Sequence, residues 1–392
     1  MNQALPVSLP EPLVAPGVPA ARRIMSIDAL RGLVMVFMLV DHVRETFLLH
    51  LQVADPMDVA ATPPALFVSR LVAHLCAPVF VFLTGLSAFL YGSKGANGPA
   101  AAASFLARRG LFLVVLELTV INFAWTASFP PKVIYLQVIW AIGLSMLALA
   151  ALVRLPRAAL AALGLAIVAG HNLLDPLHFA AGHPLHAVWA VLHDRGWLEL
   201  GETLRLRTSY PVLPWIGIIC LGYACGPWFA QGFPAPARQR RLLCWAGAAL
   251  AGFVLLRALN VYGDRPWSAG ATALQGLMSF FNVTKYPPSL LFAALTLGVG
   301  LLLLVLLERR HGVLADRLAI LGAAPMFFYI LHLYVLQLLA RGLETAGFAA
   351  RMDAVWPVWA LTLALAVALF PAVRAFAAFK ARRRDLAWLK YL

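Results

Sequence analysis

The sequence predicts an all-α, polytopic integral membrane protein with about ten transmembrane helices and both termini in the cytoplasm. Of its 392 residues, 62% are hydrophobic and only 12% are charged, and the mean hydropathy is +0.83. A soluble domain of this size carries far more charged and polar surface, so the composition excludes that class. The apolar residues also gather into runs near the ~20 residues that an α-helix needs to cross a bilayer.

Ten such runs follow one another along the chain, separated by short basic or Gly/Pro-rich links. They cover residues 29–49, 66–91, 105–125, 133–153, 158–172, 211–230, 242–260, 288–307, 318–340 and 355–378. We expect each run to form a helix. The fifth run is short enough to be re-entrant, which leaves nine or eleven spans as alternatives.

The net charge of +14 is distributed as in a membrane protein and not as in a nucleic-acid-binding one. If the N-terminus is cytoplasmic, the inner segments carry eighteen of the 31 lysines and arginines and the outer loops carry eight. With an even number of spans, this bias places both termini inside. We therefore expect an N-terminal tail at 1–23, one membrane domain at 24–380, and a basic C-terminal tail at 381–392 against lipid headgroups.

The interval 173–209 is the longest polar stretch, and we expect it to be an outer loop that folds as short helices over the outer mouth. Within it, His183 and His186 stand one helical turn apart, but no carboxylate has a convincing metal-binding spacing. The four cysteines form no CxxC pair. We therefore expect neither a metal site nor a disulfide framework.

The first expected helix places ionisable groups inside an apolar segment, where each costs at least ~2.5 kcal/mol and so marks a candidate functional site. Arg31 and His42 are eleven residues apart, so they share one helix face about 16 Å apart along the axis. His42 is a candidate general base, because a neutral imidazole accepts protons near neutral pH. Arg31 suits a phosphate group, or snorkels to the inner headgroups. Asp41 either orients the imidazole of His42 or pairs with Arg44.

Three further histidines are candidate catalytic residues. His50 lies near the outer end of the first helix, and His74 shares a face with Arg70 four residues before it. His332 lies roughly 21 Å from the inner end of the ninth helix, so these histidines and His42 could meet at one depth. The alternative for each is a structural hydrogen bond to a backbone carbonyl.

Charged and polar groups at two other places complete the candidate site. Arg44 and Arg70 join Arg31 as candidate donor-binding residues. Near the proline-anchored segment at 285–289, Lys285, Tyr286 and Asn282 are candidate acceptor-binding residues. Tyrosines at such helix entries also belong to the interfacial aromatic belt, which is the structural alternative.

Five blocks of sequence, in order, closely resemble bacterial membrane proteins similar to heparan-α-glucosaminide N-acetyltransferase. They lie at 26–44, 74–85, 210–215, 284–289 and 322–329, and the resemblance extends from about residue 23 to the end. The wider superfamily of transmembrane acyltransferases carries an Arg, ten residues and a His in its first helix, as Arg31 and His42 do here. In the lysosomal enzyme an asparagine matches His42 and the catalytic His falls near His50, so both histidines stay candidates.

The resemblance implies that acyl-CoA binds from the cytoplasmic side and that an acyl group, first of all acetyl, passes to an amine or hydroxyl of an outer-facing sugar or glycoconjugate. Acyl-CoA is then a donor substrate, and we expect no tightly bound cofactor and no nucleic acid. The expected location is a bacterial inner membrane, in contact with lipid. The oligomeric state is open, and a homodimer is one arrangement we consider. The competing hypothesis is a proton-coupled or solute transporter that uses the same histidines, although the sequence shows no internal repeat.

Overall fold

The computed structural model describes residues 24–94, 98–310, 312–383 and 385–391, so the predicted tail at 1–23 lies outside the described residues. About 70% of the described residues are helical, which confirms the helical fold class. Six helices of the described part are long and apolar enough to cross a membrane: Pro64–Gly92, Arg157–Leu174, Ala235–Leu259, Leu290–Arg309, Pro325–Thr345 and Trp356–Arg382. The predicted count of about ten spans and the cytoplasmic termini stay predictions.

The first half of the chain is built from helices that follow the predicted apolar runs. They are α1 (Met25–Phe47), η1 (Leu49–Leu51), α2 (Pro64–Ala73), α3 (Cys76–Gly92), α4 (Gly98–Leu116), η2 (Glu117–Ile121), α5 (Asn122–Thr126), α6 (Val138–Leu152) and α7 (Arg157–Gly170). The helix α1 is 23 residues long, which is enough to cross a bilayer, but it is not one of the six candidate spans because it carries too many charged residues. Its charged residues, among them Asp28, Arg31, Asp41 and Arg44, distinguish it from the purely apolar helices.

The second half contains several short helices and the last long helices. These are η3 (His171–Leu174), α8 (His186–Leu192), α9 (Leu213–Cys225), η4 (Gly226–Phe229), α10 (Ala235–Leu259), α11 (Ala273–Phe281), α12 (Leu290–Arg309), α13 (Val313–Gly322), α14 (Pro325–Thr345), α15 (Trp356–Arg382) and η5 (Ala387–Lys390). The predicted single helix at 318–340 is therefore wrong: it divides into α13 and α14. The break falls at Ala324, whose φ of −134° and ψ of 58° are non-helical, because Pro325 crowds the helical conformation of the residue before it.

A small sheet is the element that the sequence analysis did not predict. Its strands β1 (Val133–Leu136), β2 (Gly196–Leu200) and β3 (Leu204–Thr208) lie in the order β1-β3-β2. The central strand β3 runs parallel to β1 and antiparallel to β2. The predicted helical run at 133–153 thus begins with a strand. The alternation of leucine and arginine at 204–207 is the period of a strand, so a signal for β3 was present.

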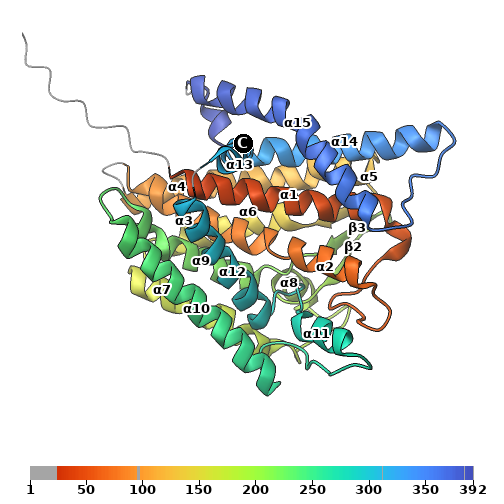
Figure 1. Ribbon diagram of the computed structural model, residues 1–392, viewed down its shortest axis with the longest axis horizontal. Coiled ribbons are helices and arrows are strands. Elements are labelled where there is room, and N and C mark those ends of the chain that lie inside the picture. Colours follow the sequence, from red (N-terminus) through yellow and green to blue (C-terminus); the bar gives the residue numbers. More distant parts are fainter. Residues whose placement is uncertain (1–23, 95–97, 311, 384, 392) are drawn as a thin grey trace, which may run out of the picture.

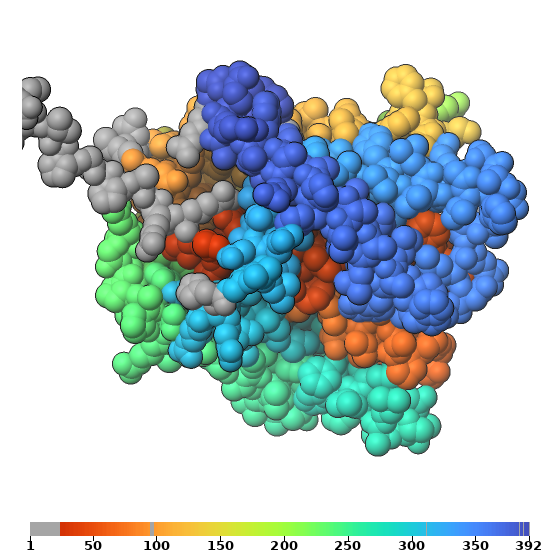
Figure 2. Space-filling view, turned by 45° about the horizontal axis from the view of Figure 1, so that its top comes forward, coloured from red at the N-terminus to blue at the C-terminus, as the bar shows by residue number. Residues whose placement is uncertain are grey.

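Helix α1 runs through the middle of the molecule, with α13, α14 and α15 against one side and α3 and α12 against another (Figure 1). Figure 2 shows α13 and α15, in shades of blue, covering α1 so that only parts of it remain visible. The contact with α13 depends on two glycines. A Cβ on Gly32 would overlap the carbonyl of Leu318, and one on Gly322 would overlap the carbonyl of Asp28. Small residues at such crossings are how helices approach closely in lipid.

Candidate active site

Two histidines from opposite ends of the sequence meet in the interior of the helical domain. Nδ1 of His42, on α1, lies 2.6 Å from Nε2 of His332, on α14. The two side chains are 8% and 0% exposed. Their ring planes are 11° apart and their centroids 5.0 Å apart, which is the arrangement of two imidazoles joined edge to edge by a hydrogen bond.

The partners of these rings determine which nitrogen carries a proton. Nδ1 of His332 lies 2.8 Å from the carbonyl oxygen of Phe328. A carbonyl only accepts, so Nδ1 of His332 is the donor and Nε2 of a neutral ring is left as an acceptor. Nδ1–H of His42 then donates to that acceptor. Consequently Nε2 of His42 carries the free lone pair, as a general base requires.

Aromatic residues surround the imidazole of His42. Trp125 and Tyr329 both present edges to it, with centroid distances of 5.2 and 5.8 Å. Nε1 of Trp125 and the hydroxyl of Tyr329 are buried next to one another, and neither makes a hydrogen bond of normal geometry with the described residues. Buried donors normally have a partner. The indole and the phenol thus place two weakly satisfied donors beside the imidazole of His42. Trp125 was not predicted as a site residue, because it ends an apolar run in the sequence.

Asp41, the neighbour of His42 on α1, is the centre of a charge cluster, which we define as Asp41, Arg44, Glu45, Arg70 and Lys285. Asp41 accepts hydrogen bonds of 2.9 to 3.0 Å from Arg44 and Arg70. Nζ of Lys285 lies 3.8 Å from Oδ2 of Asp41, and Arg44 also donates to Glu45 at 3.2 Å. Three cations thus lie close to these two carboxylates, and the carboxyl group of Asp55 lies near Arg70 and Lys285 as well.

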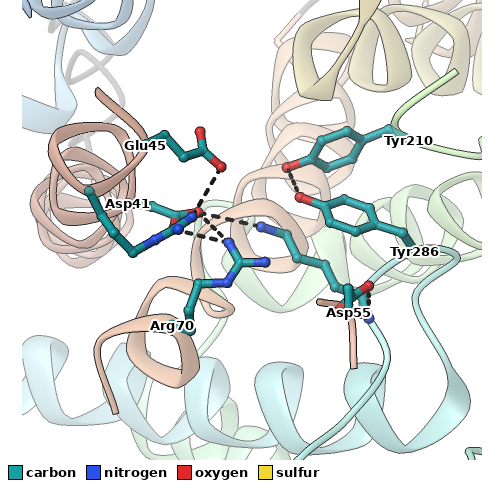
Figure 3. Close-up of polar contacts among 8 residues, drawn as sticks. Asp41, Glu45, Asp55, Arg70, Tyr210 and Tyr286 are labelled. Atoms are coloured by element: carbon teal, nitrogen blue, oxygen red, sulfur yellow. Dashed lines mark hydrogen bonds and ion pairs between the residues drawn. The ribbon is translucent and has the colours of Figure 1, made fainter. Parts of the chain in front are cut away.

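Two tyrosines face this charge cluster from the far side (Figure 3). The hydroxyl of Tyr286 donates to that of Tyr210 at 3.2 Å, and Nζ of Lys285 lies 5.7 and 5.2 Å from the two ring centroids. Burial, followed by the adjacent Tyr286, raises the pKa of Tyr210 well above its usual value, so its hydroxyl stays protonated. Burial opposes the charge on Lys285, but Tyr286 and Asp41 raise its pKa above the usual value.

The predicted acceptor residues divide into two groups. Lys285 and Tyr286 belong to the site, as described above. Asn282 is placed otherwise: its Oδ1 accepts from the backbone N–H of Met57 at 3.0 Å and its Nδ2 donates to the Met57 carbonyl at 2.7 Å. Both polar atoms of the side chain thus bind the backbone of Met57, so Asn282 joins the end of α11 to the segment around Met57.

The other predicted histidines lie in different surroundings. His50 lies on η1, with Nε2 3.8 Å from Asp353, and its side chain is 26% exposed. His74 is 1% exposed, packs against Phe292 with centroids 5.3 Å apart, and makes no hydrogen bond through its ring to the described residues. It caps α2 four residues after Arg70, so it lies beside the charge cluster, as the sequence analysis expected.

The predicted donor-binding arginines are separated in the structure. Arg44 and Arg70 bind Asp41 and therefore belong with the acceptor candidates. Arg31 lies about three turns before Asp41 on α1, where it donates to Asp28 at 3.0 Å and to the hydroxyl of Ser87 on α3. The unbroken helix α1 keeps Arg31 and His42 about 16 Å apart along its axis.

Comparison with known families adds the chemical class. Residues 23–257 match the model of the family described as heparan-alpha-glucosaminide N-acetyltransferase, catalytic. The match includes Arg31, Asp41, His42 and Arg70, whereas Lys285 and His332 lie beyond it. No curated protein matches the chain. Because the matched segment is more than half of the 392 residues, the chain belongs to the heparan-alpha-glucosaminide N-acetyltransferase catalytic-domain family, a family of membrane acyltransferases.

Proposed function

We propose that the protein transfers an acyl group, with acetyl the first candidate, from cytoplasmic acyl-CoA to an amine or hydroxyl of an outer-facing sugar or glycoconjugate. The observation that carries this proposal is the buried pair of His42 and His332. The pair supplies one imidazole nitrogen with a free lone pair inside a helical domain of an acyltransferase family.

In the proposed reaction, the nitrogen or oxygen of the acceptor attacks the thioester carbonyl while Nε2 of His42 takes the proton that this atom loses. The new C–N or C–O bond forms, and the C–S bond breaks. The proton then passes from His42 to the sulfur, which leaves as the CoA thiol. Nε1 of Trp125 and the hydroxyl of Tyr329 are the nearest donors for the carbonyl oxygen as it gains negative charge.

In this proposal, the two substrates bind near opposite ends of α1. Arg31 holds a phosphate of acyl-CoA, since a guanidinium binds phosphate through two parallel hydrogen bonds. The charge cluster and Tyr286 receive the acceptor, because three cations and a phenol suit an oxygen-rich sugar. Asp41 keeps Arg44, Arg70 and Lys285 in place and is a positioning residue. The corresponding location is a bacterial inner membrane.

The test is hydrolysis and transfer of acetyl-CoA by the purified full-length protein in detergent. Release of CoA thiol is measured with and without glucosamine as the probe acceptor. We expect His42→Ala to lower the rate by about 10² to 10⁴, the usual contribution of a general base, and Arg31→Ala to raise the KM for acetyl-CoA.

The matched control is His50→Ala, which changes a partly exposed histidine that follows the same helix and whose Nε2 lies 3.8 Å from Asp353. It should keep the wild-type rate. Loss of activity in the His50 variant but not in the His42 variant would move the base to His50. A well-folded wild-type protein that neither cleaves nor binds acetyl-CoA would overturn the proposal and favour the transporter hypothesis.

A further inference from the structure

Three metal-binding side chains gather outside the proposed active site. His171 begins η3, Asp175 follows η3, and His193 follows α8. One ligand atom from each lies within 4.8 Å of the other two. His171 and His193 are 2% and 1% exposed, whereas the side chain of Asp175 is 47% exposed. The group therefore has two buried imidazoles and one carboxylate that reaches solvent.

The ring nitrogens of the buried histidines are not all partnered, as burial normally requires. At most one ring nitrogen of His171 has a hydrogen-bond partner among the described residues, the Pro288 carbonyl, and Nδ1 of His193 has none. A buried polar group without a partner costs roughly 1 to 3 kcal/mol. A buried imidazole nitrogen of His171 without a partner, close to Asp175, indicates that this arrangement has a ligand, and the lone pairs of neutral imidazoles bind metal ions.

Neighbouring side chains orient the group as the outer shell of a metal site does. Nε2 of His193 faces Oδ1 of Asp175 at 3.4 Å, while its Nδ1 lies 3.5 Å from Oδ1 of Asp194. The other carboxylate oxygen of Asp175 accepts a hydrogen bond of 2.9 Å from Asn172. A second carboxylate behind a ligand histidine and an amide behind a ligand carboxylate are the contacts that fix metal ligands.

We propose that His171, Asp175 and His193 bind one Zn²⁺ ion. Two imidazoles and one carboxylate are three of the four ligands of a tetrahedral zinc site, and the exposed side of Asp175 admits water as the fourth. Nε2 of His193 lies 3.1 Å from the carbonyl oxygen of His171, to which it donates when protonated. On binding, the metal takes the place of that proton, which is released to solvent. This site replaces the expectation from the sequence that the chain has no metal centre.

The zinc ion would join segments that are distant in sequence. His171 and Asp175 come from the end of α7, and His193 comes from the end of α8. Oδ1 of Asn172 accepts from the backbone N–H of Leu290 at 2.9 Å, which ties the same segment to the start of α12. Lys285 and Tyr286 lie just before that helix. The proposed metal therefore stabilises the framework that carries the charge cluster, independently of which reaction the protein catalyses.

The test uses the full-length protein in detergent without a histidine tag. The protein is stripped with EDTA, loaded with Zn²⁺ and desalted, and zinc per chain is measured by mass spectrometry. Co²⁺ is loaded in parallel, because a tetrahedral site gives strong visible absorption. We expect about one zinc per chain, and at least tenfold weaker binding in His193→Ala and Asp175→Asn, the least effect that loss of a ligand should have.

His183→Ala is the matched control, since it removes an exposed histidine from the same loop that stacks on Phe179. It should bind zinc as the wild type does. Asp175→Asn keeps the shape of a half-exposed side chain, so the test does not depend on the folding of a variant with a buried substitution. A stripped wild type that takes up no zinc, or an Asp175→Asn and His193→Ala pair that bind like the wild type, would overturn the proposal.

Discussion

The hydrogen bond between His42 and His332 makes a quantitative prediction about His332. This residue does not contact the acceptor in our proposal, but it accepts the Nδ1 proton of His42 and so keeps the lone pair on Nε2. Replacing His332 with leucine leaves the buried Nδ1–H of His42 without an acceptor. The cost of such a donor is about 1 to 3 kcal/mol. Since each 1.36 kcal/mol is tenfold in rate, we expect kcat to fall about 5- to 150-fold.

His332→Gln separates this positioning role from a merely structural one. The amide oxygen of glutamine reaches about as far as Nε2 of histidine and accepts the same proton, so kcat should stay within about fivefold of the wild type. The assay is the acetyl-CoA cleavage assay over a range of substrate concentrations, with the melting temperature of each variant measured alongside. In both variants the KM for acetyl-CoA should change little. Equal loss of kcat in the glutamine and leucine variants at wild-type stability would refute the reasoning.

Two further predictions concern the framework of the site. Gly32→Ala should destabilise the protein by about 1 to 3 kcal/mol, because the added Cβ overlaps the carbonyl of Leu318. The control Gly247→Ala has open space around the added Cβ and should leave the stability unchanged. Equal melting temperatures of the two variants would contradict this prediction. Burial raises the pKa of Asp55 above its value in the unfolded chain, although the charge of Arg70 and the backbone N–H of Lys285 oppose this shift. The protonated carboxyl therefore contributes stability at low pH, and this contribution is lost as the pH rises through the pKa of the folded state. The melting temperature of Asp55→Asn relative to wild type should therefore increase between pH 4 and pH 8, and a constant difference would argue against it.

The local features of the site could be predicted from the sequence because they depend on one helix. The spacing of Arg31 and His42 follows from helix geometry alone, and the structure keeps both on the continuous helix α1. His74 and Arg70 are neighbours for the same reason. Asp41 was expected either to orient His42 or to pair with Arg44. It pairs with Arg44, which lies one helical turn away and so is a partner that spacing along one helix can suggest.

The long-range partners could not be predicted because nothing local encodes them. His42 and His332 are 290 residues apart in the chain, and Arg70 reaches Asp41 across 29 residues. Hydrophobic periodicity says that a helix has a buried face, but it does not say which other helix covers that face. The division of α13 from α14 and the use of Asn282 to join two loops are consequences of tertiary packing in the same way.

The different partners of Asp41 and His42 follow from their being neighbours on a helix. Successive residues point about 100° apart, so two adjacent side chains cannot both face the same group. His42 faces α14, where His332 and Tyr329 surround it, and Asp41 faces α2 and Lys285. The orienting partner of the imidazole is consequently His332. Asp41 instead holds three cations beside His42, where in our proposal they bind acceptor oxygens without pairing with the imidazole itself.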